Sequence, residues 1–355
     1  MDKPVDVEIS VVLAVYNGEL YLKEAIDSIL SQTFKDFEFI IVNDGSTDST
    51  AEIILACDDP RIVYIENEVN KGLIFSLNLG LSLSRGKYIA RMDADDIALP
   101  KRLQVQYDFM ESHPEIGLCG SIVEAFYEGT QKKIVVQFPE DDKSIRVYAY
   151  FQSPFCHPTV MFRKEIITKY NMEYPKAFHR AEDYALWIEM LKYTQTYNIQ
   201  SVLLHYRKHE GSETWLSGVK PERNDLITNT IQHLYFQQNG IAMAFEDIFP
   251  FACFVNRSCG YSLTKESQWK LNRILKDFFF QLRQKQQASV PLAKEYVSTA
   301  CFYHFLKSRK FPVASYLRKL YFYGFFIFLK KMPTFAKRKI NSKIQKNNSD
   351  GGLLN

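Results

Sequence analysis

Several features are missing from this chain of 355 residues, and each absence argues against a class of protein or a kind of site. No apolar run reaches about 18 residues, so the sequence predicts no transmembrane helix. The chain opens with Met-Asp-Lys-Pro-Val-Asp-Val-Glu, which has no apolar core, so no signal peptide is predicted. Cysteine occurs six times but never as C-x-x-C, which argues against zinc and predicts buried, reduced thiols in a protein facing the cytosol.

Two phosphate-binding loops are also absent, G-x-x-x-x-G-K-S/T and G-x-G-x-x-G. Any phosphate must therefore be held by other groups, such as a bound cation. The apolar content of 46% and charged content of 24% describe a globular protein, and the length suggests about two domains.

Charge is unevenly distributed along the chain, although its net value is only +3. From Cys301 onward there are twelve Lys or Arg and one acid, so the rest of the chain is mildly acidic. This argues against nucleic acid as a partner of the main body and leaves an anionic surface as a partner for the basic end.

Strands and helices are predicted to alternate over the first third of the chain, which indicates βαβ units and a mostly parallel sheet. The later part repeats this pattern less regularly and then becomes helical. The predicted strands are 9–15, 37–42, 61–65, 87–92, 117–126, 132–138, 159–162 and 199–206, and the predicted helices are 20–33, 49–57, 73–84, 99–112, 141–151, 227–238, 265–286 and 292–308.

Three carboxylates, Asp93, Asp95 and Asp96, directly follow the predicted strand at 87–92. Such groups repel one another and are costly to desolvate, and a divalent cation with oxygen ligands removes that cost. Open α/β sheets also bind ligands at the carboxyl ends of their strands. The pattern predicts a metal and phosphate site, although the D-x-D spacing alone fits a solvated acidic turn before the next helix equally well.

Polar residues also end the other early strands, which favours one shared site over separate surface turns. The sequence runs S-V-V-L-A-V-Y-N-G-E, F-I-I-V-N-D-G-S-T-D-S-T, N-K-G and Y-I-A-R-M-D-A-D-D, in this order. Over residues 8 to 210 the chain closely resembles the family 2 inverting glycosyltransferases, which have the GT-A fold. The resemblance implies a Rossmann-like, mostly parallel sheet flanked by helices and a nucleotide-sugar donor.

The resemblance also assigns roles to individual residues. Asp44 is expected to accept a hydrogen bond from a uracil-type base, and Lys71 to lie near the base or phosphates. Asp93 is expected to face the ribose and the metal, while Asp95 ligates Mg²⁺ or Mn²⁺. The base and ribose pocket is expected to be lined by Ala14, Val15, Tyr16 and Glu19.

Glu182 and Asp183 precede an apolar helical pattern. Taken alone they are ordinary acids at a helix start, which favour its dipole. In the resembling family an E-D pair at this place supplies the general base, here Asp183, with Glu182 orienting the acceptor or tuning the base. One carboxylate base suffices for a single displacement with inversion.

Two loop histidines and one arginine complete the expected site. His157 is held as an acceptor contact, with a purely structural hydrogen bond as the alternative. His209, in the family-like run Y-R-K-H-E-G-S, is the candidate for metal or diphosphate contact, again with a structural alternative. Arg207 is expected to reach the phosphates.

The chain is predicted to divide into a catalytic domain at 1–215, a helical appendage at 216–316 and a basic aromatic tail at 317–355. The tail sequence L-Y-F-Y-G-F-F-I-F-L, flanked by lysines and arginines, is too short to cross a bilayer but suits an anionic membrane surface. The alternative is a core helix of the appendage with a solvated basic end.

The sequence therefore predicts an inverting glycosyltransferase that moves a sugar from a UDP-linked donor to a carbohydrate or lipid-linked acceptor. The expected location is the cytoplasm, on the inner face of the plasma membrane. A nucleotidyltransferase is the first alternative, but the loop Y-N-G-E lacks the glycine-rich phosphate cradle it needs. A non-catalytic carbohydrate-binding module is the second, and the intact Asp44, Asp95 and Asp183 argue against it.

Overall fold

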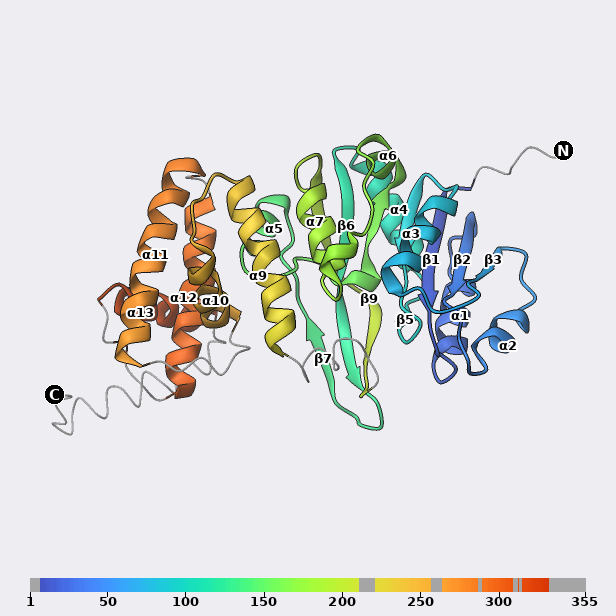
Figure 1. The fold of residues 1–355 in the computed structure, drawn as a ribbon, viewed down its shortest axis with the longest axis horizontal. Helices are drawn as coiled ribbons and strands as arrows, with labels where there is room; N and C mark the ends of the chain where they lie inside the picture. Colours follow the sequence, from blue (N-terminus) through green and yellow to red (C-terminus); the bar gives the residue numbers. More distant parts are fainter. Residues whose placement is uncertain are drawn as a thin grey trace. The chain divides into compact units, whose positions relative to one another are not determined.

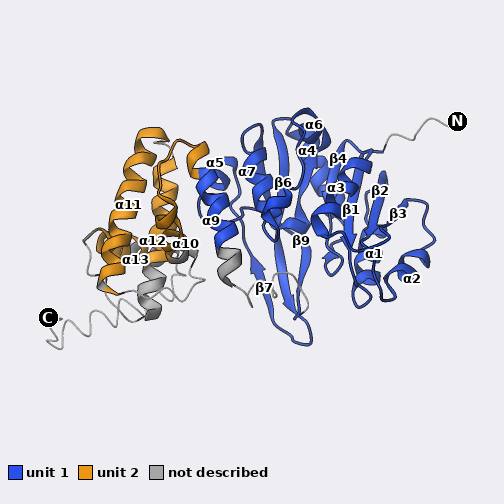
Figure 2. Cartoon of the chain, viewed as in Figure 1, with its two compact units in different colours: residues 1–235 blue, residues 236–355 orange. Residues whose placement is uncertain are grey.

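The computed structural model describes residues 7–210, 221–256, 264–286, 289–308, 312 and 315–331. The chain divides into two compact units, Met1–Tyr235 and Phe236–Asn355 (Figure 2). This boundary falls inside the segment that we predicted as the helical appendage, and the predicted domain limits stay a prediction.

Among the described residues, nine strands form one sheet: β1 (Ile9–Val15), β2 (Phe37–Asn43), β3 (Ile62–Glu66), β4 (Tyr88–Arg91), β5 (Ile97–Ala98), β6 (Ile116–Tyr127), β7 (Lys133–Val136), β8 (Met161–Arg163) and β9 (Gln195–Lys208). Their order is β3-β2-β1-β4-β8-β6-β9-β5, with β7 paired to β6 (Figure 1). The first four in this order run parallel, as predicted. Beyond β4 the sheet is mixed, because β8 pairs antiparallel with both β4 and β6.

Helices of the first unit flank this sheet (Figure 1). They are α1 (Leu22–Leu30), α2 (Thr50–Leu55), α3 (Leu73–Leu83), α4 (Arg102–Ser112), α5 (Asp142–Tyr148), α6 (Lys164–Lys169), α7 (Glu182–Met190) and α9 (Pro221–Gln238), with short 3-10 turns at His157–Thr159 and Lys176–Phe178. The short elements α6 and β5 were not predicted.

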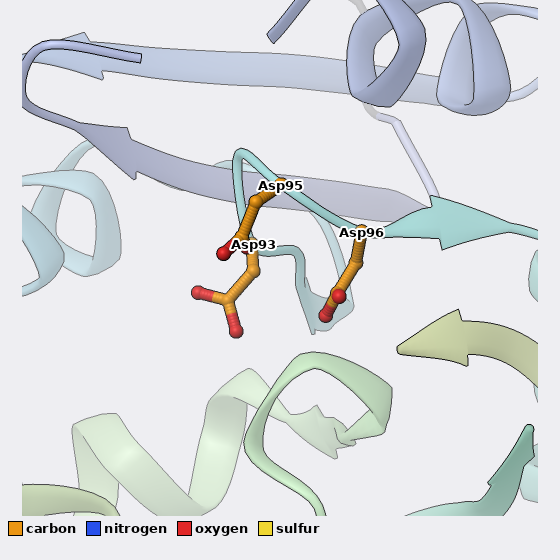
Figure 3. A group of neighbouring side chains, drawn as sticks. All are labelled: Asp93, Asp95 and Asp96. Atoms are coloured by element: carbon orange, nitrogen blue, oxygen red, sulfur yellow. The ribbon is translucent and has the colours of Figure 1, made fainter. Parts of the chain in front are cut away.

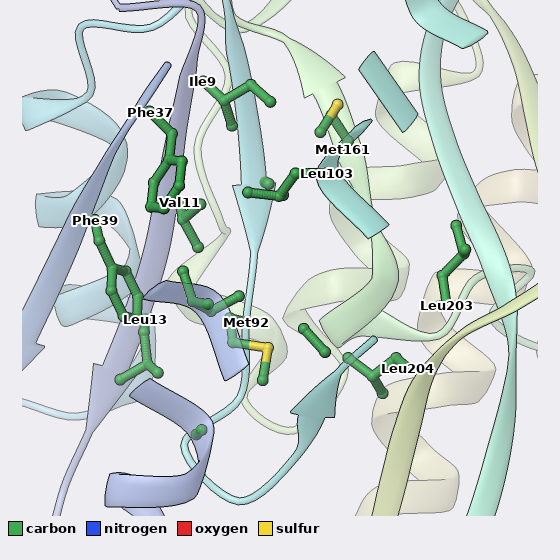
Figure 4. Close-up of a cluster of buried hydrophobic side chains, with 14 of the residues drawn as sticks. Ile9, Val11, Leu13, Phe37, Phe39, Met92, Leu103, Met161, Leu203 and Leu204 are labelled. Carbon is green, nitrogen blue, oxygen red and sulfur yellow. The ribbon is translucent and has the colours of Figure 1, made fainter. Parts of the chain in front are cut away.

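Both faces of β1 and β2 are covered, and every residue of these two strands is buried. This explains why their sequences are apolar almost without interruption rather than alternating. Figure 4 shows Val11, Leu13, Phe39 and Met92 packed in the same cluster. The packed strands form a rigid base from which the loops at their carboxyl ends project.

The buried side chain of Glu38 links the amino-terminal ends of β1, β2 and β4. Glu38 of β2 accepts from Ser10 Oγ at 2.6 Å and from the backbone N–H of Arg85 at 2.7 Å. Gly86 N–H donates in turn to Ser10 Oγ at 2.8 Å, just before β4 begins. Burial raises the pKa of Glu38, but the hydrogen bonds from Ser10 and Arg85 outweigh it and leave the pKa below its usual value.

The described part of the second unit is helical, with α10 (Phe245–Asn256), α11 (Lys265–Lys285), α12 (Val290–Ser308) and α13 (Ser315–Lys331). Its core contains the rings of Phe236, Phe251 and Phe278, with neighbouring centroids 5.2–5.8 Å apart. None of the described helices combines the length and the apolar character that crossing a bilayer requires.

Two of these helices differ from the sequence predictions. We did not predict α10, because Pro250 lies inside it and proline usually ends a helix. The start of the predicted tail belongs to α13, where Leu317 and Leu320 are buried. The rest of the predicted tail, from residue 332, lies outside the described residues.

The close approach at Gly86 gives a test of this packing. An added Cβ would lie 2.5 Å from Ser10 N and 2.7 Å from Ile9 C, both backbone atoms of a central strand. We expect Gly86→Ala to lower the free energy of unfolding by about 1–3 kcal/mol, because neither strand can move away. Urea denaturation measures the change, and Ser82→Ala on the exposed side of α3 is the control. Equal stabilities of the two variants would contradict the packing.

Candidate functional site

The loops after β1 and β2 are joined by side-chain hydrogen bonds. Asn17 Oδ1 accepts from Thr47 N–H at 2.8 Å, and Asn17 N–H donates to Ser46 Oγ at 2.9 Å. Glu19 Oε2 accepts from Ser49 N–H at 3.1 Å, beside the start of α2. The two loops therefore form one surface, and Glu19 already helps to hold it together.

The expected base and ribose pocket lies at the end of β1. Ala14 and Val15 are buried there, whereas the next residue, Tyr16, exposes 48% of its surface. An exposed aromatic ring beside a buried strand end can cover a planar base, and its role as a nucleotide contact stays a prediction.

Asp44, at the end of β2, is almost fully buried and serves three donors. Its Oδ1 accepts from the side chain of Asn67 at 2.7 Å and from Lys71 N–H at 3.0 Å, and its Oδ2 accepts from Gly72 N–H at 2.7 Å. The ammonium of Lys71 lies 4.8 Å from the ring centroid of Phe75. Asp44 thus fixes the loop after β3, a role that the sequence did not suggest, and its hydrogen bond to a base stays a prediction.

The turn after β4 brings three carboxylates together. One oxygen each of Asp93, Asp95 and Asp96 can be chosen so that all lie within 4.8 Å of one another (Figure 3). Asp96 is buried, and the other two are partly exposed. The sequence prediction that these three carboxylates form a cluster is therefore confirmed in its geometry, and their individual roles as ligands stay a prediction.

Asp96 is fixed by backbone and charge from β9. Its Oδ1 accepts from Arg207 N–H at 2.8 Å, and Arg207 Nε–H donates to the carbonyl oxygen of Asp95 at 2.8 Å. The remaining nitrogens of Arg207 pair with Glu24 and Glu128. Arg207 therefore holds the acidic turn in place, and its expected contact with phosphates stays a prediction.

His209 lies directly beside the acidic turn. Its Nε2 is 2.9 Å from Asp95 Oδ2, and its ring lies 4.8 Å from that of Tyr21. This position fits both alternatives from the sequence, a direct metal ligand or a hydrogen-bond partner that orients Asp95.

Arg91 supplies a buried positive charge behind the cluster. Its guanidinium is almost completely buried and pairs with Asp93. Its Nε has no hydrogen-bond partner within the described part of the chain. Burial lowers the pKa of Arg91, but the Asp93 carboxylate more than compensates and raises it. Arg91 therefore remains charged and stabilises the ionised form of Asp93.

The cluster still carries more negative charge than Arg91 balances, which fits a divalent cation. Asp96 Oδ2 is buried and has no hydrogen-bond partner among the described residues. Burial and the neighbouring Asp93 and Asp95 raise the pKa of Asp96 well above its usual value, and burial also raises that of Asp93. An orphaned carboxylate oxygen among carboxylates is a ligand set that Mg²⁺ and Mn²⁺ accept.

Asp183 lies in the first turn of α7 rather than at its cap, which is Ala181. Ser153 Oγ approaches Asp183 Oδ2 at 3.5 Å. Burial, followed by the neighbouring charge of Glu182, raises the pKa of Asp183 to about 7. A carboxylate with this pKa can both take up and release a proton near neutral pH, as a general base must.

His157 is partly buried against aromatic rings and hydrogen-bonded to Tyr174. Its Nε2 lies 2.9 Å from Tyr174 Oη, and its ring packs edge-on against Trp187 at 5.9 Å. Burial, and then Arg91, lower the pKa of His157 well below its usual value, so the ring is neutral. This favours the structural alternative for His157, while the acceptor contact stays a prediction.

Tyr174 connects the cluster with the candidate base. Burial raises the pKa of its hydroxyl, and the charges of Asp183, Glu182 and Asp93 raise it further, whereas Arg91 lowers it. A Coulomb interaction acts over distances longer than direct contact, so the charges of Asp93 and Asp183 both lie near Tyr174, although 90 residues separate them in the sequence.

The comparisons with known proteins agree with this geometry. The sequence profile of glycosyl transferase family 2 matches residues 10–171. An uncharacterized glycosyltransferase of Methanocaldococcus jannaschii is 38% identical over 231 residues, which are 63% of this chain and 77% of that protein. The chain belongs to glycosyl transferase family 2. As a family 2 member it is a glycosyltransferase, so the predicted class of enzyme is confirmed.

Other family 2 relatives and solved structures extend the match. The O-antigen biosynthesis glycosyltransferase WbnJ of Escherichia coli is 34% identical over 210 residues, covering 58% of this chain and 81% of its own. S. aureus TarS 1–349 in complex with UDP has a TM-score of 0.57 at 16% identity, and the match covers 86% of this chain and 93% of the TarS chain. The mannosyltransferase PcManGT of Pyrobaculum calidifontis, in complex with GDP-Man and Mn²⁺, has a TM-score of 0.51 at 16% identity, and the match covers 90% of this chain and 88% of the PcManGT chain. Both structures show that the predicted GT-A fold is correct.

Sequence reasoning missed Arg91 and Ser153, which lie beside the candidate site. It named Asp96 in the carboxylate cluster but gave it no individual role. Arg91 could have been suspected, as a charge inside an otherwise apolar strand. Ser153 has no such signal, since only the fold brings it to Asp183.

Two adjacent pockets of about 490 and 520 Å³ lie elsewhere on the first unit. Arg163, Glu165 and Lys169 line both of them. None of the candidate site residues described in this subsection lines either pocket, so the candidate site is recognised by its charges and strand ends rather than by cavity volume.

The raised pKa of Asp183 predicts a pH-dependent stability. Between about pH 4, the pKa of an unfolded Asp, and pH 7, the folded protein binds a proton that the unfolded chain has lost. Wild-type stability should therefore fall as the pH rises through this window. In thermal scans, Asp183→Asn should have a higher melting temperature than the wild type at pH 8 and about the same melting temperature near pH 4.

The control for these scans is Glu189→Gln, at an exposed position of the same helix. It should show the same small offset from the wild type at every pH. A constant offset for Asp183→Asn as well would contradict the raised pKa.

Proposed function

We propose that this enzyme transfers a sugar from a UDP-linked donor to a carbohydrate or lipid-linked acceptor with inversion at the anomeric carbon, assisted by a divalent cation. The single observation that carries this proposal is the arrangement around Tyr174. The Asp183 carboxyl group, with a pKa of about 7, and Asp93 of the carboxylate cluster both raise the pKa of the Tyr174 hydroxyl and so lie near it. This pairs one base with one cation-binding cluster that can hold the leaving diphosphate through its metal ion, as a single displacement requires.

The donor nucleotide is expected along the carboxyl ends of β1 and β2. Tyr16 would cover the base, with Ala14 and Val15 beneath it and Glu19 toward the ribose. Asp44 would accept from the N3–H of uracil, while Lys71 would lie near the phosphates. UDP is favoured because TarS, which shares the fold, was solved with UDP, although PcManGT was solved with GDP-Man.

The diphosphate is expected at the acidic turn. Asp93, Asp95 and Asp96, with His209 beside them, would hold Mg²⁺ or Mn²⁺, and PcManGT was solved with Mn²⁺. When bound, the cation neutralises the charge that develops on the departing diphosphate. Arg207 keeps this turn in register with β9 through its two hydrogen bonds to Asp95 and Asp96.

Asp183 is proposed as the general base. It would take the proton of the acceptor hydroxyl while that oxygen attacks the anomeric carbon on the face opposite the diphosphate. The bond from the anomeric carbon to the diphosphate oxygen breaks in the same step, and its electron pair leaves with UDP. Glu182 is proposed to keep the pKa of Asp183 high, because its negative charge lies next to it.

The acceptor is proposed to be a cell-surface glycan or its lipid-linked precursor, since the relative WbnJ acts in O-antigen biosynthesis. A lipid-linked acceptor makes attachment to the inner face of the plasma membrane useful. We propose such attachment through the basic, aromatic C-terminal end of the chain, because lysine and arginine favour anionic headgroups.

The metal site is tested by Asp95→Asn. The variant should lose the part of UDP affinity that depends on Mn²⁺, because an amide is a poorer ligand and leaves the cluster incomplete. Isothermal titration of UDP with Mn²⁺ and with EDTA measures this part. Asp58→Asn, an exposed acid near α2, is the control. Equal Mn²⁺ dependence in Asp95→Asn and the wild type would remove Asp95 from the metal site.

The base is tested by Asp183→Asn, after a panel of nucleotide-sugars with Mn²⁺ has identified the donor. Transfer should fall by about 10²–10⁴-fold, because the amide cannot take the acceptor proton. Donor affinity should stay within about twofold, since the residue acts on the acceptor. Glu189→Gln on the same helix should retain full transfer. Transfer by Asp183→Asn within about tenfold of the wild type would rule it out as the base.

A further inference from the structure

Helix α11 presents an exposed stripe of aromatic and basic side chains. The stripe consists of Trp269, Arg273, Lys276, Phe280 and Arg283, which are spaced four, three, four and three residues apart and all exposed. This spacing places all five on one narrow face of a helix. The buried face of the same helix, by contrast, carries Leu271, Leu275, Phe278 and Leu282.

The exposure of the two rings at this face is unusual. Trp269 is 57% exposed and Phe280 is 64% exposed, although each could bury a large apolar area. Their exposure is costly in water unless a partner covers the rings. An exposed aromatic pair on one helix face therefore indicates a surface that another body covers.

The charges on the stripe select the kind of partner. Arg273 is paired with Asp247 of α10, at 2.9 Å. Lys276 and Arg283 lie between and beyond the two rings, while the exposed acids Glu266 and Asp277 lie along the edge of the stripe. The alternation of a Trp or Phe with a Lys or Arg suits the boundary of an anionic bilayer, where rings enter the headgroup layer and cations meet phosphates.

Helix α13 packs against α11 and carries the same kinds of exposed side chain. The N–H of Tyr316 donates to Asn272 Oδ1 at 2.9 Å, which places the first turn of α13 next to the middle of α11. Both helices belong to the second unit (Figure 2). The exposed residues of α13 include Arg318, Lys319, Phe322 and Tyr323, again two basic residues with two rings.

We propose that the stripe on α11 is a docking surface for an anionic lipid bilayer. The helix would lie in the plane of the headgroups, with Trp269 and Phe280 inserted and Lys276 and Arg283 at the phosphates. From the first to the last residue the stripe spans about 21 Å at roughly 1.5 Å per residue, enough for several headgroups. The proposal deepens the proposed membrane attachment by giving it a folded surface in place of the C-terminal end alone.

The test is co-sedimentation of the full chain with vesicles of phosphatidylglycerol and phosphatidylcholine, compared with phosphatidylcholine alone, at low salt. The wild type should bind only the anionic vesicles. Trp269→Ala/Phe280→Ala and Lys276→Glu/Arg283→Glu should each lower the partition coefficient by about 10- to 100-fold, from the lost apolar area and the reversed charges. UDP binding in solution should remain unchanged in both, because the site lies in the first unit.

Matched controls come from the same chain. Phe249→Ala removes an exposed ring of α10 that is outside the stripe, and Lys35→Glu/Lys143→Glu reverses two exposed lysines of the first unit. Both should bind vesicles as the wild type does. Equal losses in the charge control and in Lys276→Glu/Arg283→Glu would show attraction to the whole protein and overturn the stripe as the docking surface.

A chain that ends at Lys331 separates the stripe from the C-terminal end. Binding by this chain and loss in the stripe variants support the proposal. If the shortened chain loses vesicle binding while the stripe variants bind fully, the stripe is not the docking surface, and the proposed attachment through the C-terminal end is retained. If the wild type binds no vesicles, both the stripe as a docking surface and the proposed membrane attachment are overturned. If light scattering shows that the wild type is a dimer and the stripe variants are monomers, the stripe is a contact with a second copy of the chain instead.

Discussion

Negative charge buried at the end of a central strand is the constraint on which the rest of this structure depends. Three carboxylates follow β4 directly, and burial raises the pKa of two of them, Asp93 and Asp96. Charges of one sign in a poorly solvated place need counter-charges or protons. Arg91 supplies one positive charge from behind, and Arg207 holds the turn through its backbone and side chain. The remaining imbalance is what a divalent cation and the diphosphate of a donor would resolve together.

The same constraint explains why the neighbouring parts are built as they are. The loops after β1 and β2 are bonded to each other, and Asp44 fixes the loop after β3, so the edge facing the carboxylates is rigid before any donor arrives. Preorganisation of this kind lowers the cost of binding, because few groups must be ordered when the ligand binds. Asp183, like Asp93, lies near Tyr174, and its raised pKa suits it to the proposed role of a base near neutral pH.

The family and most of the fold of the first unit could be predicted from the sequence, because the signals there are local. Strand periodicity identified β1 within its observed limits, and the motifs at the strand ends identified the family. What could not be predicted depends on contacts between distant segments. Arg207 was expected at phosphates, and only the fold shows its pairs with Glu24 and Glu128. Helix α10 was missed because local rules place Pro250 at a helix end, whereas packing against the unit's core retains it inside.

The anomeric configuration of the first product tests the central claim most directly, that one base acts opposite one leaving diphosphate. Proton NMR of a reaction with an α-linked nucleotide-sugar reports the anomeric coupling, and slow transfer to water suffices if the acceptor is unknown. The account predicts that the first sugar released or transferred is the β anomer, since a single displacement inverts the carbon. An α product at the earliest times would contradict it, because retention requires a second displacement that Asp183 alone does not provide.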